Sequence, residues 1–308
     1  MRGITALLIG NFDGVHLAHQ SLVQEARHRA GSAGEVVALT FEPHPVTVLD
    51  PGAEQRRLTT AAGRTRLLEE TGCDRVVEME PTPQRLAQSP GDFIAWFVEQ
   101  FHPDVLVEGP DFHFGKDRSG DVRLLSTVGD TSGFETVVVE PIRATLPGGE
   151  EVVVRSGLIR TLLEDGRIED ANALLGRCWS LEGLVVEGEK RGRTLSMPTA
   201  NLDHGDLILP QDGVYAGRAV LPGGEQRLAA ISVGEKPTFE TVDRLCEVHL
   251  LDHDGPLDDY GWWIQVQFDR LIRDQVAFDS MEALVEQMEH DVEAIRQCGI
   301  DVGSTHGS

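Results

Sequence analysis

The spacing of apolar residues changes near residue 176, and this change constrains the fold more than any other feature of the 308-residue chain. Before residue 176, short apolar runs alternate with segments of helical periodicity, an order typical of a doubly wound parallel sheet. After it, β-rich stretches follow one another across turns rich in Gly, Pro and Asp, which is typical of a small antiparallel barrel or sandwich. We therefore expect an α/β domain over residues 1–176 and a β domain over 177–308.

Both expected domains can be divided into elements. In the first, buried strands are expected at residues 6–9, 36–41, 75–79 and 105–107, with helices at 61–70, 91–101 and 168–176. In the second, strands are expected at residues 184–187, 213–221, 228–233, 246–251 and 263–268, followed by a closing amphipathic helix at 280–296. Ligands of doubly wound sheets bind beyond the carboxyl ends of the strands, so the loops that follow the first-domain strands are the candidate sites.

Composition limits the partners of the chain. The formal net charge is −24, which disfavours nucleic acid and anionic membranes because both require a positively charged surface. The four cysteines lie far apart without a C-x-x-C pair, so neither a disulfide framework nor a cysteine metal site is expected. No apolar run approaches membrane length, and the N-terminus lacks the apolar segment of a signal peptide. We expect a cytoplasmic protein that acts on small molecules.

Residues 10–20 read Gly-Asn-Phe-Asp-Gly-Val-His-Leu-Ala-His-Gln and directly follow the first expected strand. His16 and His19 are three residues apart where a helix begins, so they are expected to share one helix face. The positive end of a helix dipole and its free N–H groups suit a phosphate. Two imidazoles at this place are able to hold or protonate the phosphates of a nucleotide. The alternative is a strand-to-helix turn with two surface histidines.

Two further loops follow expected strands at the same edge. Residues 41–45, Phe-Glu-Pro-His-Pro, are stiffened by two prolines and place His44 near the edge, although a plain turn is the alternative. Residues 109–120 contain three glycines, Lys116 and Arg118, which suits a flexible loop that contacts an anion. Loops rich in glycine and charge are common, however, so this composition alone is weak support.

A third candidate segment lies in the second domain. Residues 188–195 contain two glycines and three basic residues, a composition suited to a phosphate-binding loop. Thr199 and Asn201 follow and are two residues apart, so in an extended segment they face the same side. A hydroxyl and an amide oxygen are hard ligands suited to Mg²⁺. The alternative is a basic hairpin turn that leads into a strand.

The first-domain segments resemble motifs of the prokaryotic FAD synthetases, which combine riboflavin kinase with FMN adenylyltransferase. Residues 10–20 are similar to G-x-F-D-G-x-H-x-G-H-Q, with Ala18 in place of a glycine, and the two later loops resemble F-x-P-H-P and G-x-D-F-x-F-G-x-x-R-x-G. This resemblance implies a nucleotidyltransferase-like domain with His16 and His19 as catalytic residues. It further implies nucleotide contacts from Asn11, Asp13, His44, Asp111, Arg118, Ser156 and Arg160.

The segment 155–160 departs from the family. It resembles S-S-T-x-I-R, but Arg155 and Gly157 replace a serine and the threonine, while Ser156 and Arg160 match. Hydrogen bonds to a charged phosphate are worth about 1.5–3 kcal/mol each, so their loss predicts slower adenylyl transfer. The alternative is that the Arg155 guanidinium takes over the role of the missing hydroxyls.

The second-domain segments resemble riboflavin kinases. Residues 188–201 are similar to G-x-x-x-G-R-x-L-G-F-P-T-A-N, and residues 210–216, 233–239, 247–252 and 271–274 resemble four further family segments. The resemblance implies that Thr199 and Asn201 bind Mg²⁺ and ATP phosphate, and that Glu247 is the catalytic base. It implies ligand contacts from Gly188, Lys190, Gly192, Arg193, Tyr215 and Arg273.

The resemblance predicts two reactions: phosphorylation of riboflavin to FMN with Mg-ATP in the second domain, and adenylylation of FMN to FAD with another ATP in the first. Two alternatives stay open. One is a riboflavin kinase with a degenerate adenylyltransferase-like domain. The other is a non-catalytic flavin- or nucleotide-binding regulator, which Glu247 disfavours because binding alone does not require a base.

Overall fold

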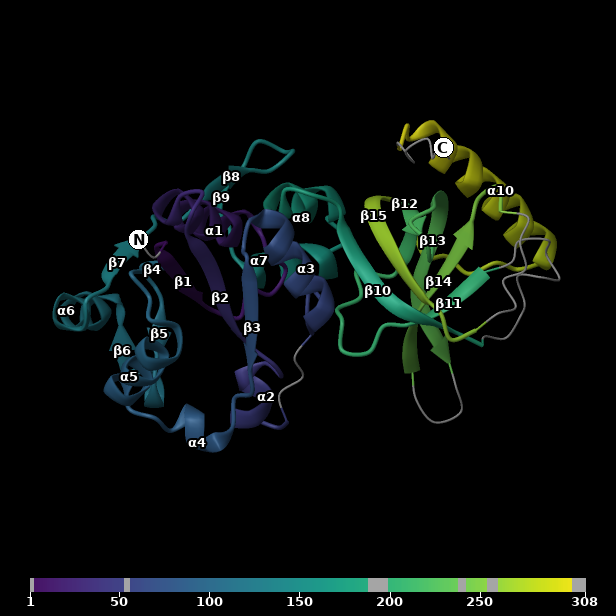
Figure 1. Ribbon diagram of the computed structural model, residues 1–308. Helices are drawn as coiled ribbons and strands as arrows, with labels where there is room; N and C mark the ends of the chain where they lie inside the picture. Colours follow the sequence, from purple (N-terminus) through teal and green to yellow (C-terminus); the bar gives the residue numbers. More distant parts are fainter. Residues whose placement is uncertain (1–2, 53–55, 188–198, 238–241, 254–259, 301–308) are drawn as a thin grey trace. The chain divides into compact units, whose positions relative to one another are not determined.

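A computed structural model describes residues 3–52, 56–187, 199–237, 242–253 and 260–300 (Figure 1). The chain divides into two compact units, which we describe separately. The first unit comprises Met1–Ala144 with Glu151–Ser156, and the second comprises Thr145–Glu150 with Gly157–Ser308. No helix within the described ranges has the length and apolar character required to cross a membrane.

The first unit is built on a five-stranded parallel sheet in the order β3-β2-β1-β4-β7. Its strands are β1 (Thr5–Ile9), β2 (Glu35–Phe41), β3 (Arg75–Met79), β4 (Val105–Glu108) and β7 (Glu135–Val138). The order runs outward in one direction from β1 to β3 and in the other from β4 to β7. The topological switch point therefore lies between β1 and β4, where sheets of this kind bind ligands.

Helices cover both faces of this sheet. Alternate residues of β1 face opposite sides, so Leu8 packs with Val23 of α1 (Leu17–Ala30) and Leu68 of α3 (Ala61–Thr71). Leu7 faces the other core, to which α5 (Pro90–Phe101) and α6 (Val122–Ser132) contribute Phe97 and Leu125. The predicted doubly wound α/β architecture is confirmed. Short elements complete the unit: α2 (Pro45–Leu49), α4 (Pro83–Leu86), β5 (His113–Phe114), η1 (Lys116–Arg118), β6 (Gly120–Asp121), β8 (Arg143–Thr145) and β9 (Glu151–Val153).

The second unit contains a closed barrel, coloured teal to yellow-green in Figure 1, with strand order β10-β11-β14-β13-β12-β15. All pairings between these strands are antiparallel. The strands are β10 (Trp179–Val186), β11 (Thr199–Asp203), β12 (Gly213–Val220), β13 (Gln226–Pro237), β14 (Val242–Leu250) and β15 (Trp263–Asp274). Three helices accompany them: α7 (Ser156–Glu164), α8 (Ile168–Leu175) and α10 (Met281–Gln297).

Aromatic packing fills the barrel, and α10 closes one side. The ring of Phe268 lies 5.0 Å from that of Trp179 and 5.4 Å from that of Tyr215, measured between centroids. From α10, Ile295 packs against Ala216 of β12 in a separate apolar cluster. This arrangement confirms the predicted antiparallel barrel with a closing helix.

Candidate active sites

The turn after β1 has an unusual backbone. Phe12, Gly14 and Val15 have φ angles of 48°, 84° and 39°. A bulky or β-branched side chain disfavours this left-handed region, and each such residue costs about 1–3 kcal/mol. The side chains of Phe12 and Val15 are almost fully buried, so packing holds the backbone in this conformation. The strain sits in the segment for which the sequence predicts phosphate chemistry.

Asp13 fixes this turn from within. Its carboxylate, 5% exposed, accepts hydrogen bonds from the backbone N–H of Leu58 at 3.0 and 3.1 Å and of Thr59 at 3.2 Å. The Thr59 hydroxyl also donates to Asp13, at 3.2 Å, and accepts from Gly14 N at the same distance. The structure therefore supports a role for Asp13 in holding the turn, and its predicted nucleotide contact stays a prediction.

His16 and His19 lie together, as predicted, but not as two residues of one helix. His16 is the N-cap of α1, with an extended backbone, and the helix begins at Leu17. The two rings nevertheless stack, with centroids 3.6 Å apart and planes 16° apart. The first turn of α1 contains no acidic residue, so the positive end of its dipole is available to an anion.

A chain of hydrogen bonds joins four candidate residues and defines the His16 tautomer. The backbone N–H of His19 donates to Nδ1 of His16 at 3.4 Å, so this nitrogen is unprotonated. Nε2 then carries the proton and donates to the Ser156 hydroxyl at 3.1 Å. That hydroxyl in turn donates to the Asp13 carbonyl at 3.0 Å. The structure therefore brings His16, His19, Ser156 and Asp13 together.

The remaining first-domain candidates follow strand ends or lie on α7. His44 caps α2 through Nδ1, which accepts from Val46 N at 3.2 Å, and Asp111 and Arg118 are exposed on the segment that follows β4. Asn11 Oδ1 is buried and makes no hydrogen bond with any residue that the structure describes. Arg160 is half-buried on α7 and belongs to the second compact unit, so its predicted nucleotide contact stays a prediction.

Sequence analysis missed Glu108, a fully buried carboxyl group at the end of β4. Its Oε1 accepts from the backbone N–H of Ile9 at 2.8 Å, so it joins the ends of the two strands at the switch point. Burial, together with the charge of Asp111, raises the pKa of Glu108 well above the usual value of a glutamate, against the opposing effect of the Ile9 N–H. Burial at this position therefore favours the neutral form of the Glu108 carboxyl group.

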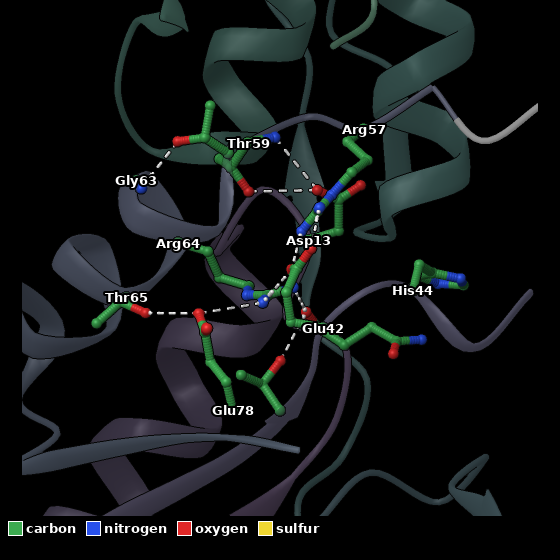
Figure 2. Close-up of polar contacts among 12 residues, drawn as sticks. Asp13, Glu42, His44, Arg57, Thr59, Gly63, Arg64, Thr65 and Glu78 are labelled. Carbon is green, nitrogen blue, oxygen red and sulfur yellow. Dashed lines mark hydrogen bonds and ion pairs between the residues drawn. The ribbon is translucent and has the colours of Figure 1, made fainter. Parts of the chain in front are cut away.

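A second feature that sequence analysis missed is a charged cluster beneath the loop after β2 (Figure 2). The Glu42 carboxylate accepts two hydrogen bonds from Arg57, at 2.8 and 2.7 Å, and one from Arg64 at 2.9 Å. Arg64 also donates to the Asn11 carbonyl at 3.4 Å. Burial opposes ionisation of Glu42, but the two arginines outweigh it, and the pKa of Glu42 lies below its usual value.

The candidate residues of the second unit lie on two neighbouring strands. Asn201 of β11 is directly opposite Glu247 of β14, and Thr199 lies two residues along the same strand. Ala200 and Val248, between them, are buried in the barrel, so these three side chains face outward. Directly opposed residues of an antiparallel pair have Cβ atoms about 4.5–5.5 Å apart. The strand register therefore brings together the three predicted residues.

These residues fit a magnesium site. The Thr199 hydroxyl and the Asn201 amide oxygen are hard oxygen ligands, and neither side chain, nor that of Glu247, makes a hydrogen bond or ion pair with another described residue. Mg²⁺ commonly takes few protein ligands together with substrate phosphates. Among the described residues there is no group of three or more His, Cys, Asp or Glu side chains able to hold a metal.

Comparisons with known proteins cover both units. Residues 2–148 match the FAD synthetase family and residues 175–298 the riboflavin kinase family. A bifunctional riboflavin kinase/FMN adenylyltransferase of Listeria monocytogenes is 32% identical over 94% of this chain and 91% of its own length. The enzyme of the same name from Escherichia coli is 34% identical over 92% of this chain and 90% of its own length. The chain belongs to this bifunctional family. A crystal structure described as a macrolide-efflux protein from Streptococcus pneumoniae has a TM-score of 0.85 and 29% identity, covering 96% of this chain and 95% of that one.

Within the riboflavin kinase region, two predicted ligand residues have structural partners. Tyr215 is fully buried in the barrel, and its hydroxyl donates to the Gln211 carbonyl, so the structure places it in the core and not on an open surface. Arg273 forms a bidentate ion pair with the buried Asp291 of α10, at 2.8–3.1 Å. The predicted ligand contacts of both stay predictions. Four further predicted residues lie outside the described residues: Gly188, Lys190, Gly192 and Arg193.

Proposed function

We propose that this chain catalyses two consecutive reactions. The second unit phosphorylates riboflavin to FMN with Mg-ATP, and the first unit transfers AMP from another ATP to FMN, which gives FAD and pyrophosphate. The observation that carries this proposal is the match to both families over one chain, with relatives that carry both names over nine-tenths of their length. We place the domain boundary at residues 176/177, and a cytoplasmic location stays a prediction from the sequence.

The strand register supports the roles proposed for the kinase site. Glu247 accepts the proton of the ribityl 5′-hydroxyl as its oxygen attacks the γ-phosphorus of ATP, and ADP leaves. Thr199 and Asn201 would hold Mg²⁺, which neutralises phosphate charge. Gly188, Lys190, Gly192 and Arg193 are proposed to contact the phosphates, and Tyr215 and Arg273 to shape the flavin site. A carboxylate on a barrel strand is held in place by the backbone ladder, which favours its use as a base.

The hydrogen-bond chain of the first unit supports a separate set of roles. A phosphate oxygen of FMN attacks the α-phosphorus of ATP, and pyrophosphate leaves. We assign His16 Nε2–H and His19 to the charge that develops on the transferred phosphate and the leaving group. Ser156 and Arg160 contact the phosphates of ATP, and Asp13 holds the turn. Asn11, His44, Asp111 and Arg118 are proposed as further nucleotide contacts.

One observation favours a second candidate function. Arg155 and Gly157 stand where the family has two hydroxyl side chains. A chain that makes FMN but does not adenylylate it would be a riboflavin kinase with an inactive first unit.

One assay distinguishes these functions. The protein is incubated with riboflavin and Mg-ATP, FMN and FAD are separated by chromatography, and FMN is then supplied in place of riboflavin. We expect both products. Glu247→Gln should lower FMN formation by about 10²–10⁴-fold and leave adenylylation of supplied FMN unchanged. Glu182→Gln, the same substitution on β10, is the matched control. Formation of FMN alone would support the monofunctional kinase, and formation of neither product would refute the proposal.

A further inference from the structure

Residues 57–60, which we call the brace, join the two loops that follow β1 and β2. Arg57 is bound to Glu42 of the loop after β2, and the next two residues donate to Asp13 of the turn after β1. The last residue, Thr60, is the N-cap of α3, where its hydroxyl accepts from Gly63 N at 2.9 Å. Four consecutive residues therefore link both loops to the start of a helix that packs on the sheet (Figure 2).

The contact between Arg57 and Glu42 permits one relative orientation. A guanidinium that donates two parallel hydrogen bonds to one carboxylate lies close to the plane of that carboxylate, which a single ammonium contact does not require. The Arg57 side chain is 9% exposed and that of Arg64 is 2% exposed, so both guanidinium groups are largely shielded from water. Burial and the charge of Arg57 lower the pKa of Arg64, and Glu42 partly offsets this. Glu42 thus pairs with both buried cations, and Glu78 supplies a second carboxylate 3.6 Å from the Arg64 guanidinium.

Both loops that the brace joins carry predicted nucleotide residues. Glu42 lies two residues before His44, and Asp13 lies three residues before His16 in the strained turn. The position of the His44 loop relative to the His16 turn therefore depends in part on the hydrogen bonds of the brace. Arg64 of α3 supplies a second link between the same loops, because it donates to Glu42 at 2.9 Å and to the Asn11 carbonyl at 3.4 Å.

We propose that Arg57 is a positioning residue for adenylyl transfer, which acts through Glu42 to set the His44 loop against the His16 turn. This proposal rests on the proposed function of the first unit. Adenylyl transfer requires the attacking and transferred phosphates to be aligned, and a misplacement of about 1 Å can lower a rate about 10²-fold. The effect of losing Arg57 should therefore appear in kcat, because alignment and not binding is lost.

A second arginine of the same unit offers a matched control. Arg27 is ion-paired with Asp74 and donates to the carbonyl groups of Gly72 at 3.0 Å and Gly34 at 3.2 Å. These contacts lie at the amino edge of the sheet, just before β2 and β3 begin. Arg27 thus holds loops together as Arg57 does, at the edge that carries no predicted nucleotide residue.

The test compares Arg57→Met, Arg57→Lys, Glu42→Gln, the Arg57→Met/Glu42→Gln double variant and Arg27→Met in the full chain. Adenylylation of supplied FMN gives kcat and the KM values for ATP and FMN. Riboflavin phosphorylation by the same preparation measures the activity of the second unit. Arg57→Met should lower the adenylylation kcat about 10–100-fold, with both KM values within about twofold and phosphorylation unchanged. Arg57→Lys should recover part of the loss, and the double variant should be no slower than the slower single variant.

Three results would overturn the proposal. The first is an unchanged kcat in Arg57→Met, and the second is a raised KM in this variant at constant kcat, which would indicate direct nucleotide contact. The third is an equal loss of kcat in Arg27→Met. If Arg57→Met does not fold, Arg57→Lys tests the proposal. We expect its adenylylation kcat to fall about three- to tenfold, and a wild-type kcat would overturn the proposal. A wild-type chain that makes no FAD from FMN would instead refute the proposed function of the first unit, and the proposal with it.

Discussion

Replacement of Asp13 by asparagine tests how the turn after β1 is held. The carboxylate accepts from two backbone N–H groups and one hydroxyl, all buried. An asparagine with its oxygen in the place of Oδ1 keeps an acceptor for all three donors, but it loses the charge and turns its NH₂ group toward the Leu58 N–H. Hydrogen bonds to a charged acceptor are worth about 1.5–3 kcal/mol and those to a neutral acceptor about 0.5–1.5 kcal/mol, so each of the three bonds should weaken by about 1 kcal/mol. We expect Asp13→Asn to lower the unfolding free energy of the first unit by about 2–4 kcal/mol.

The assay must separate the two units, because a two-unit chain need not unfold in one step. Calorimetry follows both transitions, and riboflavin phosphorylation measured in increasing urea identifies that of the second unit. The matched control is Asp74→Asn, which removes a carboxylate that accepts from Val36 N at 2.7 Å at the opposite edge of the sheet. Both variants should destabilise the first unit, but only Asp13→Asn should slow adenylyl transfer in the folded protein. A loss below about 1 kcal/mol, or normal adenylyl transfer, would refute the role assigned to Asp13.

Three further predictions follow from the same geometry. Asn201→Ala should raise the Mg²⁺ concentration that half-saturates riboflavin phosphorylation and leave FMN adenylylation unchanged; equal loss in both reactions would contradict separate sites. A Cβ added at Gly157 meets no described atom within 4 Å, so Arg155→Ser with Gly157→Thr should fold and accelerate FAD formation about tenfold or more, whereas slower formation would assign the phosphate contact to Arg155. Because the folded-state pKa of Glu108 is raised, ionisation of this group in the unfolded chain favours unfolding as pH rises above about 4.3. The melting temperature of Glu108→Gln relative to that of the wild type should therefore be higher at pH 7.5 than at pH 5; a pH-independent difference would contradict a raised pKa of Glu108.

The fold was predictable because the spacing of apolar residues differs between the two domains, and this spacing is visible in the local sequence. The third predicted strand, residues 75–79, coincides with β3, and the helix predicted at 168–176 ends at Gly176, which has a φ of 70°. The boundaries of the barrel strands were less accurate. The first was predicted from residue 184, but β10 begins at Trp179, where alternate side chains already face the barrel interior. Its polar and glycine positions are compatible with a loop until the partner strand β15 is in place.

The candidate sites were predictable only where ligand residues lie close together in sequence. His16 and His19 were predicted from their spacing, although the cap position of His16 was not. Arg57, Arg64 and Glu108 were missed because their burial depends on partners far along the chain: Arg57 meets Glu42 across 15 residues, and Glu108 meets Ile9 across 99. A charged residue read from sequence is expected to be exposed, and only tertiary contacts place it inside.

The two candidate sites are held by different means. Asn201 and Glu247 are neighbours because two strands pair, and the ladder that fixes their register is part of the barrel itself. The candidate residues of the first unit come from loops beyond a parallel sheet, and among the described residues no strand ladder joins the loop after β1 to the loop after β2. Side-chain contacts supply the missing connections, through Asp13, Arg57 and Glu108. Loops that are held by a few buried polar contacts can adopt other conformations when one contact is lost. The strands of a closed barrel, in contrast, cannot change register without breaking many hydrogen bonds. We therefore expect the geometry of adenylyl transfer to depend on buried side-chain contacts that link the loops, and that of phosphorylation to depend on the strands that carry Asn201 and Glu247.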